Sequence, residues 1–238
     1  MNITRRLSAT IFITTYLIAL YGQCCAQSTS SLGNWEAMYL KAKISPRWSL
    51  MGEGNIISSN YNMKYDYFEV KTGIAYDFSN KLTGLFGTGY FNTDQPGGFL
   101  KTPALQREFR TWLELTYKQA YKCLKLNQRA RIEQRYIAGD YKNRFKYLFG
   151  LTVPVNKPEL IKNSLYITLF DEIWLPQYGM FMEKNRLFAG AGYIMNDNVT
   201  WQIGCVSDTD YKPGSHTFKN YLLLALIYDL SKFIKKHS

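Results

Sequence analysis

The chain has 238 residues, with 29 Lys and Arg against 18 Asp and Glu, and a formal net charge of +11. Its mean hydropathy is −0.25, although it contains 19 tyrosines and 14 phenylalanines. This combination argues against a bundle of transmembrane helices and leaves two classes open, a strand-built membrane protein and a soluble β-sandwich.

Residues 1–26 have the pattern of a secretory signal peptide. They contain a basic start, an apolar segment and small residues before a cleavage point: Arg5 with Arg6, residues 9–21 (ATIFITTYLIALY), and Cys24-Cys25-Ala26. The apolar segment is shorter than the ~20 residues of a spanning helix, which disfavours a membrane anchor. Lipid modification at Cys24 or Cys25 is also disfavoured, because the preceding residues do not fit a lipoprotein start. We expect a mature domain of residues 27–238, whose formal charge falls from +11 to +9 with the loss of two arginines.

Eleven segments of the mature chain alternate in polarity with a period of two, which predicts β-strands that have two different faces. In chain order they are residues 35–43, 48–57, 67–76, 82–91, 108–117, 124–136, 144–153, 164–174, 183–195, 199–206 and 218–230. Most hold about ten residues, and short and long connections alternate between them, with the longest at residues 92–105. Both features are typical of outer-membrane barrels, which have tight periplasmic turns and longer outer loops.

The predicted fold class is therefore all-β, a single antiparallel transmembrane β-barrel of about 10–12 strands that fills residues 27–238. Eleven strands conflict with the even numbers of bacterial single-chain barrels. We expect ten or twelve, with the polar lead before Trp35 contributing a strand or with one segment misassigned. Tyr76, Tyr193 and Tyr228 end strands beside short turns, which predicts an aromatic girdle at a membrane interface.

Residues 124–136 (LKLNQRARIEQRY) indicate which side of the wall faces inward. One side carries Lys125, Arg129, Arg131 and Arg135, whereas the other side is largely apolar. A Lys or Arg facing lipid near the midplane costs ~2–4 kcal/mol, so the four together cost on the order of 10 kcal/mol. We therefore expect the charged side to face the lumen, in a register that a one-residue slip would reverse.

Several blocks of sequence resemble a known family. They are EFRTW at 108–112, RARIEQRY at 129–136, RFKY at 144–147, DEIW at 171–174 and EKNRL at 183–187. The family is catalogued as domain of unknown function 2490, is common in secreted proteins of Bacteroidetes-type bacteria, and is generally taken for an outer-membrane barrel. The resemblance covers nearly the whole mature chain and implies a barrel in the outer membrane of a Gram-negative bacterium. The family has no assigned reaction, so the resemblance supplies no catalytic residues.

The candidate site is a network of charged side chains in the lumen. Its members with a possible binding role are Arg129, Arg131, Glu133, Arg135, Arg110, Glu108, Arg186 and Glu172, and the same sides of the strands carry Arg144, Lys146, Glu53, Glu69 and Glu114. The favoured interpretation is a salt-bridged polar core inside a non-enzymatic structural or interaction barrel, whose outer loops meet partners. The alternative is a small channel or anionic-ligand-binding barrel that uses the lumenal arginines.

An outer-membrane lipid hydrolase is a remote alternative, because it needs a serine activated by a histidine. The available histidine is His216, beside Ser215 and near Asp208 and Asp210, and we expect these residues in a loop between strands without a hydrolase signature. We therefore expect no enzyme activity.

The sequence also bounds the cofactors and partners. Cys123 and Cys205 are expected to be unpaired thiols on separate strands. No metal-ligand spacing stands out, so we expect no metal and no cofactor. A signal peptide and charge confined to one side of the strands argue against nucleic acid. The expected partners are outer-membrane lipid and an anionic solute or ligand in the lumen, with a monomer as the default state.

Overall fold

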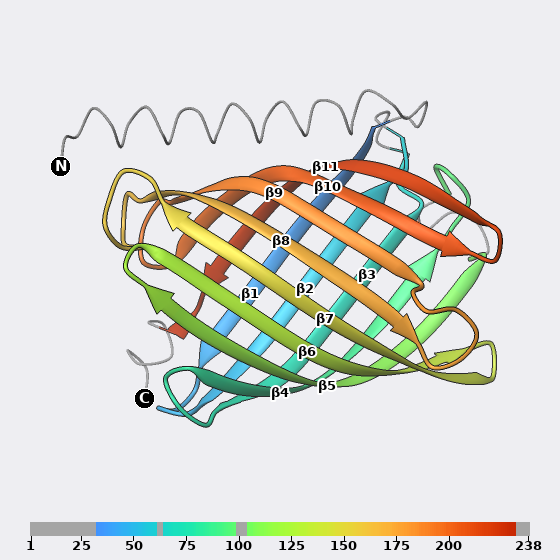
Figure 1. The fold of residues 1–238 in the computed structure, drawn as a ribbon, viewed down its shortest axis with the longest axis horizontal. Helices are drawn as coiled ribbons and strands as arrows, with labels where there is room; N and C mark the ends of the chain where they lie inside the picture. Colours follow the sequence, from blue (N-terminus) through green and yellow to red (C-terminus); the bar gives the residue numbers. More distant parts are fainter. Residues whose placement is uncertain (1–31, 61–63, 99–103, 232–238) are drawn as a thin grey trace. The chain divides into compact units, whose positions relative to one another are not determined.

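The computed structural model describes residues 32–60, 64–98 and 104–231, which form eleven strands closed into one barrel (Figure 1). The strands are β1 (Gly33–Lys43), β2 (Trp48–Ser58), β3 (Tyr67–Asp77), β4 (Leu82–Thr93), β5 (Gln106–Tyr121), β6 (Leu124–Ile137), β7 (Asp140–Pro154), β8 (Leu165–Pro176), β9 (Lys184–Ile194), β10 (Val199–Lys212) and β11 (Ser215–Asp229). The predicted signal peptide, residues 1–26, lies outside the described residues. The compact unit that contains the barrel runs from Ser31 to Ser238.

The barrel closes through a parallel pair of strands. Every other neighbouring pair, from β1–β2 to β10–β11, is antiparallel. β1 and β11 instead run in the same direction, from Gly33 opposite Tyr221 to Lys41 opposite Asp229. A meander with an odd number of strands returns to its first strand pointing the same way, so its closure has to be parallel. All eleven predicted segments are strands, so the predicted all-β barrel of about 10–12 strands is confirmed. The preference for an even number of strands is wrong, and for this reason one of the strand pairs is parallel.

The two ends of the barrel differ in their connections. We call the end with residues 44–47, 78–81, 122–123, 155–164 and 195–198 the turn end, and the end with residues 59–66, 94–105, 138–139, 177–183 and 213–214 the loop end. The turn end lies on the left of Figure 1 and the loop end on the right. The expected alternation of short and long connections holds except at residues 155–164, 138–139 and 213–214.

Two connections at the loop end are two-residue hairpins where the sequence predicted loops. Between β6 and β7, Ala138 and Gly139 have φ of 49° and 92°, the positive values that a type I′ turn requires at both central positions. Between β10 and β11, the turn residue Gly214 has φ of 74°. The polar residues around these turns therefore continue the strands, and β10 and β11 are longer than predicted.

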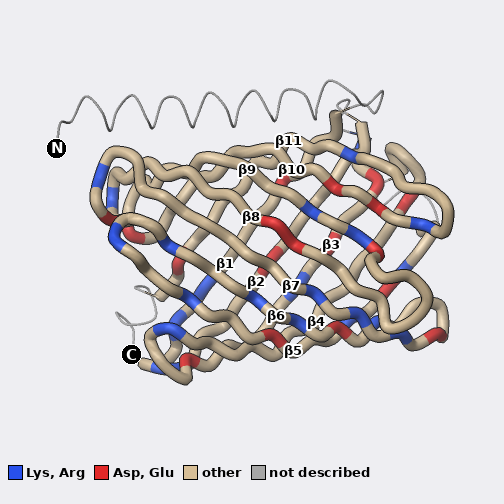
Figure 2. Tube along the Cα trace, viewed as in Figure 1, with Lys and Arg blue, Asp and Glu red and all other residues tan. Residues whose placement is uncertain are grey.

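The inner face of the wall carries charged side chains and the outer face carries apolar ones, the reverse of a soluble protein. Glu133 and Arg144 face inward and are each 1% exposed, whereas Val70 and Leu113 face outward and are each 59% exposed. The charged side of residues 124–136 faces the lumen, as the cost of lipid-facing arginine predicted. Figure 2 shows Lys and Arg interspersed with Asp and Glu along the strands.

The interior has an apolar region near the parallel seam. The apolar region contains Trp35, Ala37, Ile57, Phe188, Val206, Tyr221, Leu223 and Ala225, which come from β1, β2, β9, β10 and β11. Phe170 and Phe188 stack at its border with ring centroids 5.0 Å apart. The charged side chains concentrate on the other part of the wall, chiefly β5 to β9. Among the described residues, no helix has the length and apolar character needed to cross a membrane.

Candidate functional site: the ion-paired lumen

Glu133 on β6 is the centre of the largest ion-pair network in the described lumen. Its carboxylate accepts two hydrogen bonds from Arg144, from Nη2 at 2.6 Å and from Nε at 3.1 Å. The Lys146 ammonium lies 2.8 Å away, the Arg131 guanidinium 3.2 Å and the Arg110 guanidinium 4.0 Å. The Glu133 carboxylate offsets part of the desolvation cost of these cations, and it is the only carboxylate paired with Lys146 among the described ion pairs.

From this centre the network continues toward the turn end. Arg131 donates from Nε to Glu114 at 2.8 Å. Arg129, one inward position further along β6, donates to Glu172 on β8 at 2.7 Å and lies 3.9 Å from Glu114. The strand pairing explains the first contact, since Arg131 is directly opposite Glu114. The second contact crosses β7 and joins strands that are not neighbours.

The network also continues toward the loop end. Glu108 binds Arg110 through both carboxylate oxygens, at 2.7 and 2.8 Å, and accepts a second pair of hydrogen bonds from Arg135. Two-point pairing of this kind fixes both the distance and the plane of the guanidinium. Glu183, just before β9, then accepts from Arg135 at 3.2 Å and from Arg144 at 3.0 Å.

Two smaller ion-paired groups lie in the same lumen. Lys71 bridges Glu53 and Glu69 at 2.5 and 2.6 Å. Arg186 makes a two-point contact with Asp208 at 2.6 and 2.7 Å. The latter group also contains Lys184, which pairs with both Asp208 and Asp210. In the described lumen these pairs join nine cations to nine carboxylates, so the formal charges of the network balance.

Buried tryptophans connect the charged groups across the lumen. Four cations surround the Trp174 ring, with Lys146 at 3.8 Å, Arg144 at 4.3 Å, Arg186 at 4.9 Å and Lys184 at 5.0 Å from its centroid. Its indole N–H donates to Glu172 at 2.6 Å. A desolvated cation over an indole face gains up to ~2 kcal/mol. Trp174 therefore contacts cations of two separate groups, the Glu133 network and the Asp208 group, and packs between them.

A glycine makes room for a second tryptophan. Gly87 on β4 is directly opposite Trp112 on β5. A Cβ at Gly87 would lie 2.2 Å from the Trp112 indole, so the ring covers the glycine on the inner face of the wall. The Arg131 guanidinium lies 5.0 Å from the centroid of this ring.

The lumen holds two cavities. A cavity of about 440 Å³ lies toward the loop end and one of about 280 Å³ toward the turn end. The residues that line both cavities, which we call the waist, are Trp35, Glu69, Lys71, Arg131, Lys146 and Arg186. The waist therefore contributes four cations and one carboxylate, and every one of these cations has a carboxylate partner in the described lumen.

All eight residues predicted as a binding network lie in this lumen and take part in its ion pairs: Arg129, Arg131, Glu133, Arg135, Arg110, Glu108, Arg186 and Glu172. Their role in binding stays a prediction. The predicted set lacked Trp35, Lys71, Trp174, Glu183, Lys184, Asp208 and Asp210. The inward positions of Trp174 and Lys184 follow from the alternation of their strands, whereas Asp208 and Asp210 lie beyond the predicted end of their strand at residue 206.

The residues considered for a hydrolase are not in a loop, and this expectation is wrong. Asp208 lies within β10, and Ser215 and His216 begin β11. Asp208 is buried in the lumen, bound by Arg186 and Lys184. His216 is exposed and packs edge-on against Phe218, on the other face of the same hairpin. The imidazole and that carboxylate therefore do not form a catalytic pair.

Metal binding and disulfide formation each require side chains in a specific arrangement. The described part of the chain contains no cluster of three His, Cys, Asp or Glu side chains that fits a metal ion. No disulfide joins Cys123 and Cys205.

A family model described as "Protein of unknown function (DUF2490)" matches residues 32–219, from the residue before β1 into β11. The chain belongs to the DUF2490 family. Because the match covers the first ten strands and the start of the eleventh, the family signature extends over the barrel and its ion-paired interior. Comparisons of this DUF2490 barrel with curated proteins and with solved structures find no match.

Proposed function

We propose that this DUF2490 barrel spans the outer membrane of a Gram-negative bacterium after export with a cleaved signal peptide, and that it is not an enzyme. The inverted polarity of the wall carries the proposal. Large apolar side chains such as Leu113 and Val70 are well exposed on the outside, while charged groups fill the inside. Soluble monomers rarely expose so continuous an apolar surface to water.

Aromatic groups at both ends of the wall support the same proposal. At the turn end, Tyr76 contacts Trp48 and Phe78, with ring centroids 4.7 and 5.1 Å apart. At the loop end, Tyr136 contacts Phe109 and Tyr141, at 6.2 and 5.4 Å. Two aromatic belts that flank an apolar band are the usual arrangement at the two interfaces of a membrane barrel.

Extraction and electrophoresis test the membrane proposal. We expect the protein to stay with membranes after alkaline carbonate and to migrate differently on a gel before and after boiling. Release by carbonate together with unchanged migration would contradict a membrane barrel.

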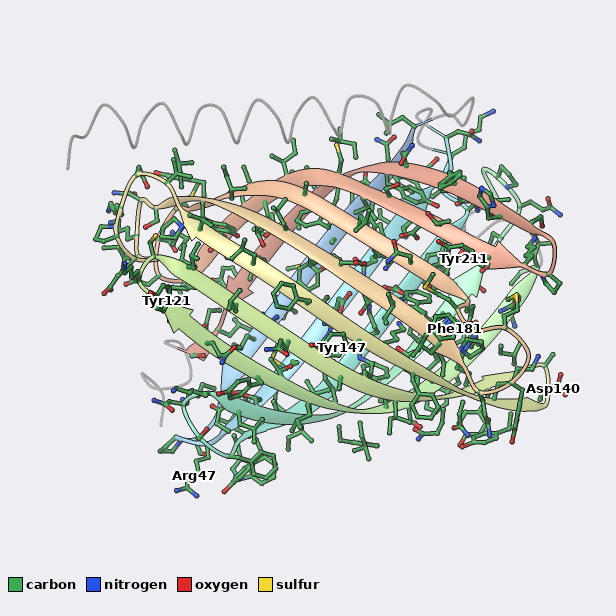
Figure 3. The ribbon with its side chains drawn as sticks, in the orientation of Figure 1. Arg47, Tyr121, Asp140, Tyr147, Phe181 and Tyr211 are labelled. Atoms are coloured by element: carbon green, nitrogen blue, oxygen red, sulfur yellow. The ribbon has the colours of Figure 1, made fainter. Side chains whose placement is uncertain are left out.

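Within the membrane, we propose a structural or interaction role with a closed interior. The support is the charge balance of the ion-pair network, since its nine cations and nine carboxylates are engaged with each other. The loop end offers exposed aromatic side chains to a partner, because Tyr178 and Phe181 in the β8–β9 connection are 81% and 90% exposed. Figure 3 places Phe181 and Asp140 at this end of the barrel. We expect a monomeric barrel whose partners bind at the loop end.

Conductance in a planar bilayer tests the closed interior. The refolded protein is expected to be silent. Glu133→Ala is the matched variant expected to give open steps, because it removes the central carboxylate and leaves Lys146 in the lumen without a carboxylate partner. Steady conductance by the unmodified protein would contradict the proposal.

The waist supports a second candidate function, a small channel or a barrel that binds an anionic ligand. Its excess of cations over carboxylates would favour an anion at the narrow point between the cavities. In this case the unmodified protein gives ohmic, anion-preferring steps that weaken in Arg131→Ala. Silence from correctly refolded protein would exclude this candidate.

A further inference from the structure

The outer surface of the barrel has an apolar groove of about 740 Å³. Its walls are large lipid-facing side chains from β3 to β7, chiefly Ile74, Phe86, Leu113, Ile132 and Phe145. These walls belong to one row of directly opposed residues, Ile74–Phe86–Leu113–Ile132–Phe145.

The next row toward the turn end contains small residues, and this explains the groove. It runs Trp48–Tyr76–Gly84–Leu115–Ala130–Tyr147 across β2 to β7. Gly84 and Ala130 leave space on either side of Leu115. The ring of Phe78 covers Gly84, where a Cβ would lie 2.7 Å from its edge. The groove therefore begins at Phe78 and continues past Ala130.

The row of small residues runs from the turn end of the barrel at β2 to the middle of the wall at β7. Trp48 is the first residue of β2, at the turn end, whereas Ala130 and Tyr147 lie halfway along β6 and β7. Figure 3 shows Tyr147 in the middle of the wall and Arg47 at the turn end. Because barrel strands tilt by about 45°, a row across them is also inclined to the membrane normal. A chain lying in the groove would therefore run from the interface toward the midplane.

A cation lies at the end of the groove that is nearest the turn end of the barrel. Arg47, in the β1–β2 turn, is exposed and donates from Nη1 to the hydroxyl of Tyr76 at 3.1 Å. Its backbone carbonyl accepts from Asp77 at 2.8 Å, which ties this turn to the end of β3. The nearby Asp77 carboxylate is engaged by the Thr83 hydroxyl at 2.7 Å and by Lys43 at 3.9 Å. The remaining N–H groups of Arg47 are thus positioned at headgroup level beside an apolar groove.

We propose that this groove binds a glycerophospholipid with an anionic headgroup, with the phosphate at Arg47 and one acyl chain along Gly84, Leu115 and Ala130. The proposal rests on the proposed membrane location. Short turns face the periplasm in outer-membrane barrels, so the turn end contacts the inner, phospholipid leaflet. An arginine held by a tyrosine hydroxyl suits a phosphate oxygen, and the groove suits a hydrocarbon chain.

Quenching of tryptophan fluorescence by brominated phospholipids tests this site. Trp48 lines the groove, Trp201 is exposed on the outer face of β10 outside it, and Trp35, Trp112 and Trp174 are buried in the lumen. Trp201→Phe therefore leaves Trp48 as the lipid-facing reporter, and Trp48→Phe leaves Trp201. Each protein is refolded into vesicles that mix brominated phosphatidylglycerol or brominated phosphatidylcholine with unbrominated lipid.

At Trp48 we expect the anionic lipid to bind about fivefold more tightly than the zwitterionic one, which corresponds to ~1 kcal/mol for one arginine near a charged headgroup. At Trp201 the ratio is expected to be about one. In the Trp201→Phe background, Arg47→Gln should remove the preference, while Arg107→Gln, a matched change of an exposed arginine at the loop end, should preserve it.

Filling the groove gives an independent variant. Ala130→Leu is expected to weaken the preference at Trp48, whereas Ala191→Leu, on the lipid side of β9, leaves it unchanged. Equal quenching by both lipids at Trp48, or a preference that survives Arg47→Gln, would overturn the lipid site while leaving the membrane barrel intact. Displacement of the brominated lipid by lipopolysaccharide but not by unbrominated phosphatidylglycerol would also overturn it. If neither Trp48 nor Trp201 is quenched, the membrane location itself fails.

Discussion

Removing the charge of Glu133 is the most direct perturbation of the lumen. Glu133→Gln keeps the shape of the side chain but changes nine balanced carboxylates to eight. Three of the four cations around Glu133 retain another carboxylate partner and lose only part of their ion pairing: Arg131, Arg144 and Arg110. Lys146 has no other carboxylate partner among the described ion pairs. We expect a loss of about 3–5 kcal/mol in the free energy of unfolding, the usual cost of leaving a buried charge unpaired.

A second substitution separates this cause from general disruption. Lys146→Met removes the unpaired ammonium and keeps an unbranched apolar stem against Trp174, from whose centroid Lys146 is 3.8 Å away. Glu133→Gln with Lys146→Met should therefore recover most of the lost stability, because replacing a whole buried pair is often nearly neutral. Lys146→Met alone should cost less than Glu133→Gln alone, since Glu133 keeps Arg144 and Arg131.

Reversible urea unfolding in lipid vesicles, followed by tryptophan fluorescence, measures these differences in the free energy of unfolding. The comparison requires that the variants share the same dependence of this free energy on urea concentration. Glu159→Gln, in the exposed β7–β8 connection, is the matched control and should stay within ±0.5 kcal/mol of the unmodified protein. If Glu133→Gln costs less than about 1 kcal/mol, or if the double variant is no more stable than the single one, the lumen is not stabilised by this hub.

Three further predictions address the wall and its orientation. Leu113→Arg should destabilise the barrel by about 2–4 kcal/mol in vesicles, measured by the same unfolding assay, and an unchanged stability would argue against lipid on that face. Gly87→Ala should cost about 1–3 kcal/mol because its Cβ meets the Trp112 ring, whereas Gly54→Ala, with no neighbour within 4 Å, should be tolerated; equal urea midpoints would contradict this packing. Cys123, exposed in the β5–β6 turn, should react with a membrane-impermeant maleimide after lysis but not on whole cells, and labelling of whole cells would reverse the proposed orientation.

The strands and their facing could be predicted because the cost of misplaced charge is large and local. In residues 124–136 four cations share one face, and a one-residue slip would turn all of them toward lipid. The same reasoning placed Glu108 and Arg110 on the inner face of β5. It was less informative for β11, where residues 221–227 are apolar on both faces because the inner face packs in the apolar region near the seam.

The partners within the lumen could not be predicted from alternation. Arg129 pairs with Glu172 over 43 residues of sequence, and Arg135 with Glu183 over 48, and both contacts depend on how the wall curves and closes. Polar composition also hid the extended β10–β11 hairpin, because residues 207–217 have the composition of a loop but continue the ladder. The parallel seam follows from the odd number of strands, and the even numbers usual in bacterial single-chain barrels argue against it.

The seam also has a consequence for protein engineering. Gly33 begins β1 at the loop end, and Asp229 ends β11 at the turn end. In the proposed membrane location, a reporter fused ahead of β1 and a second one fused behind β11 would stand in opposite compartments, whereas in an even-stranded barrel they would share one. No short turn can join these two ends in a circular permutant, because they lie at opposite ends of the barrel and an irregular linker is not tolerated in the hydrocarbon layer between them.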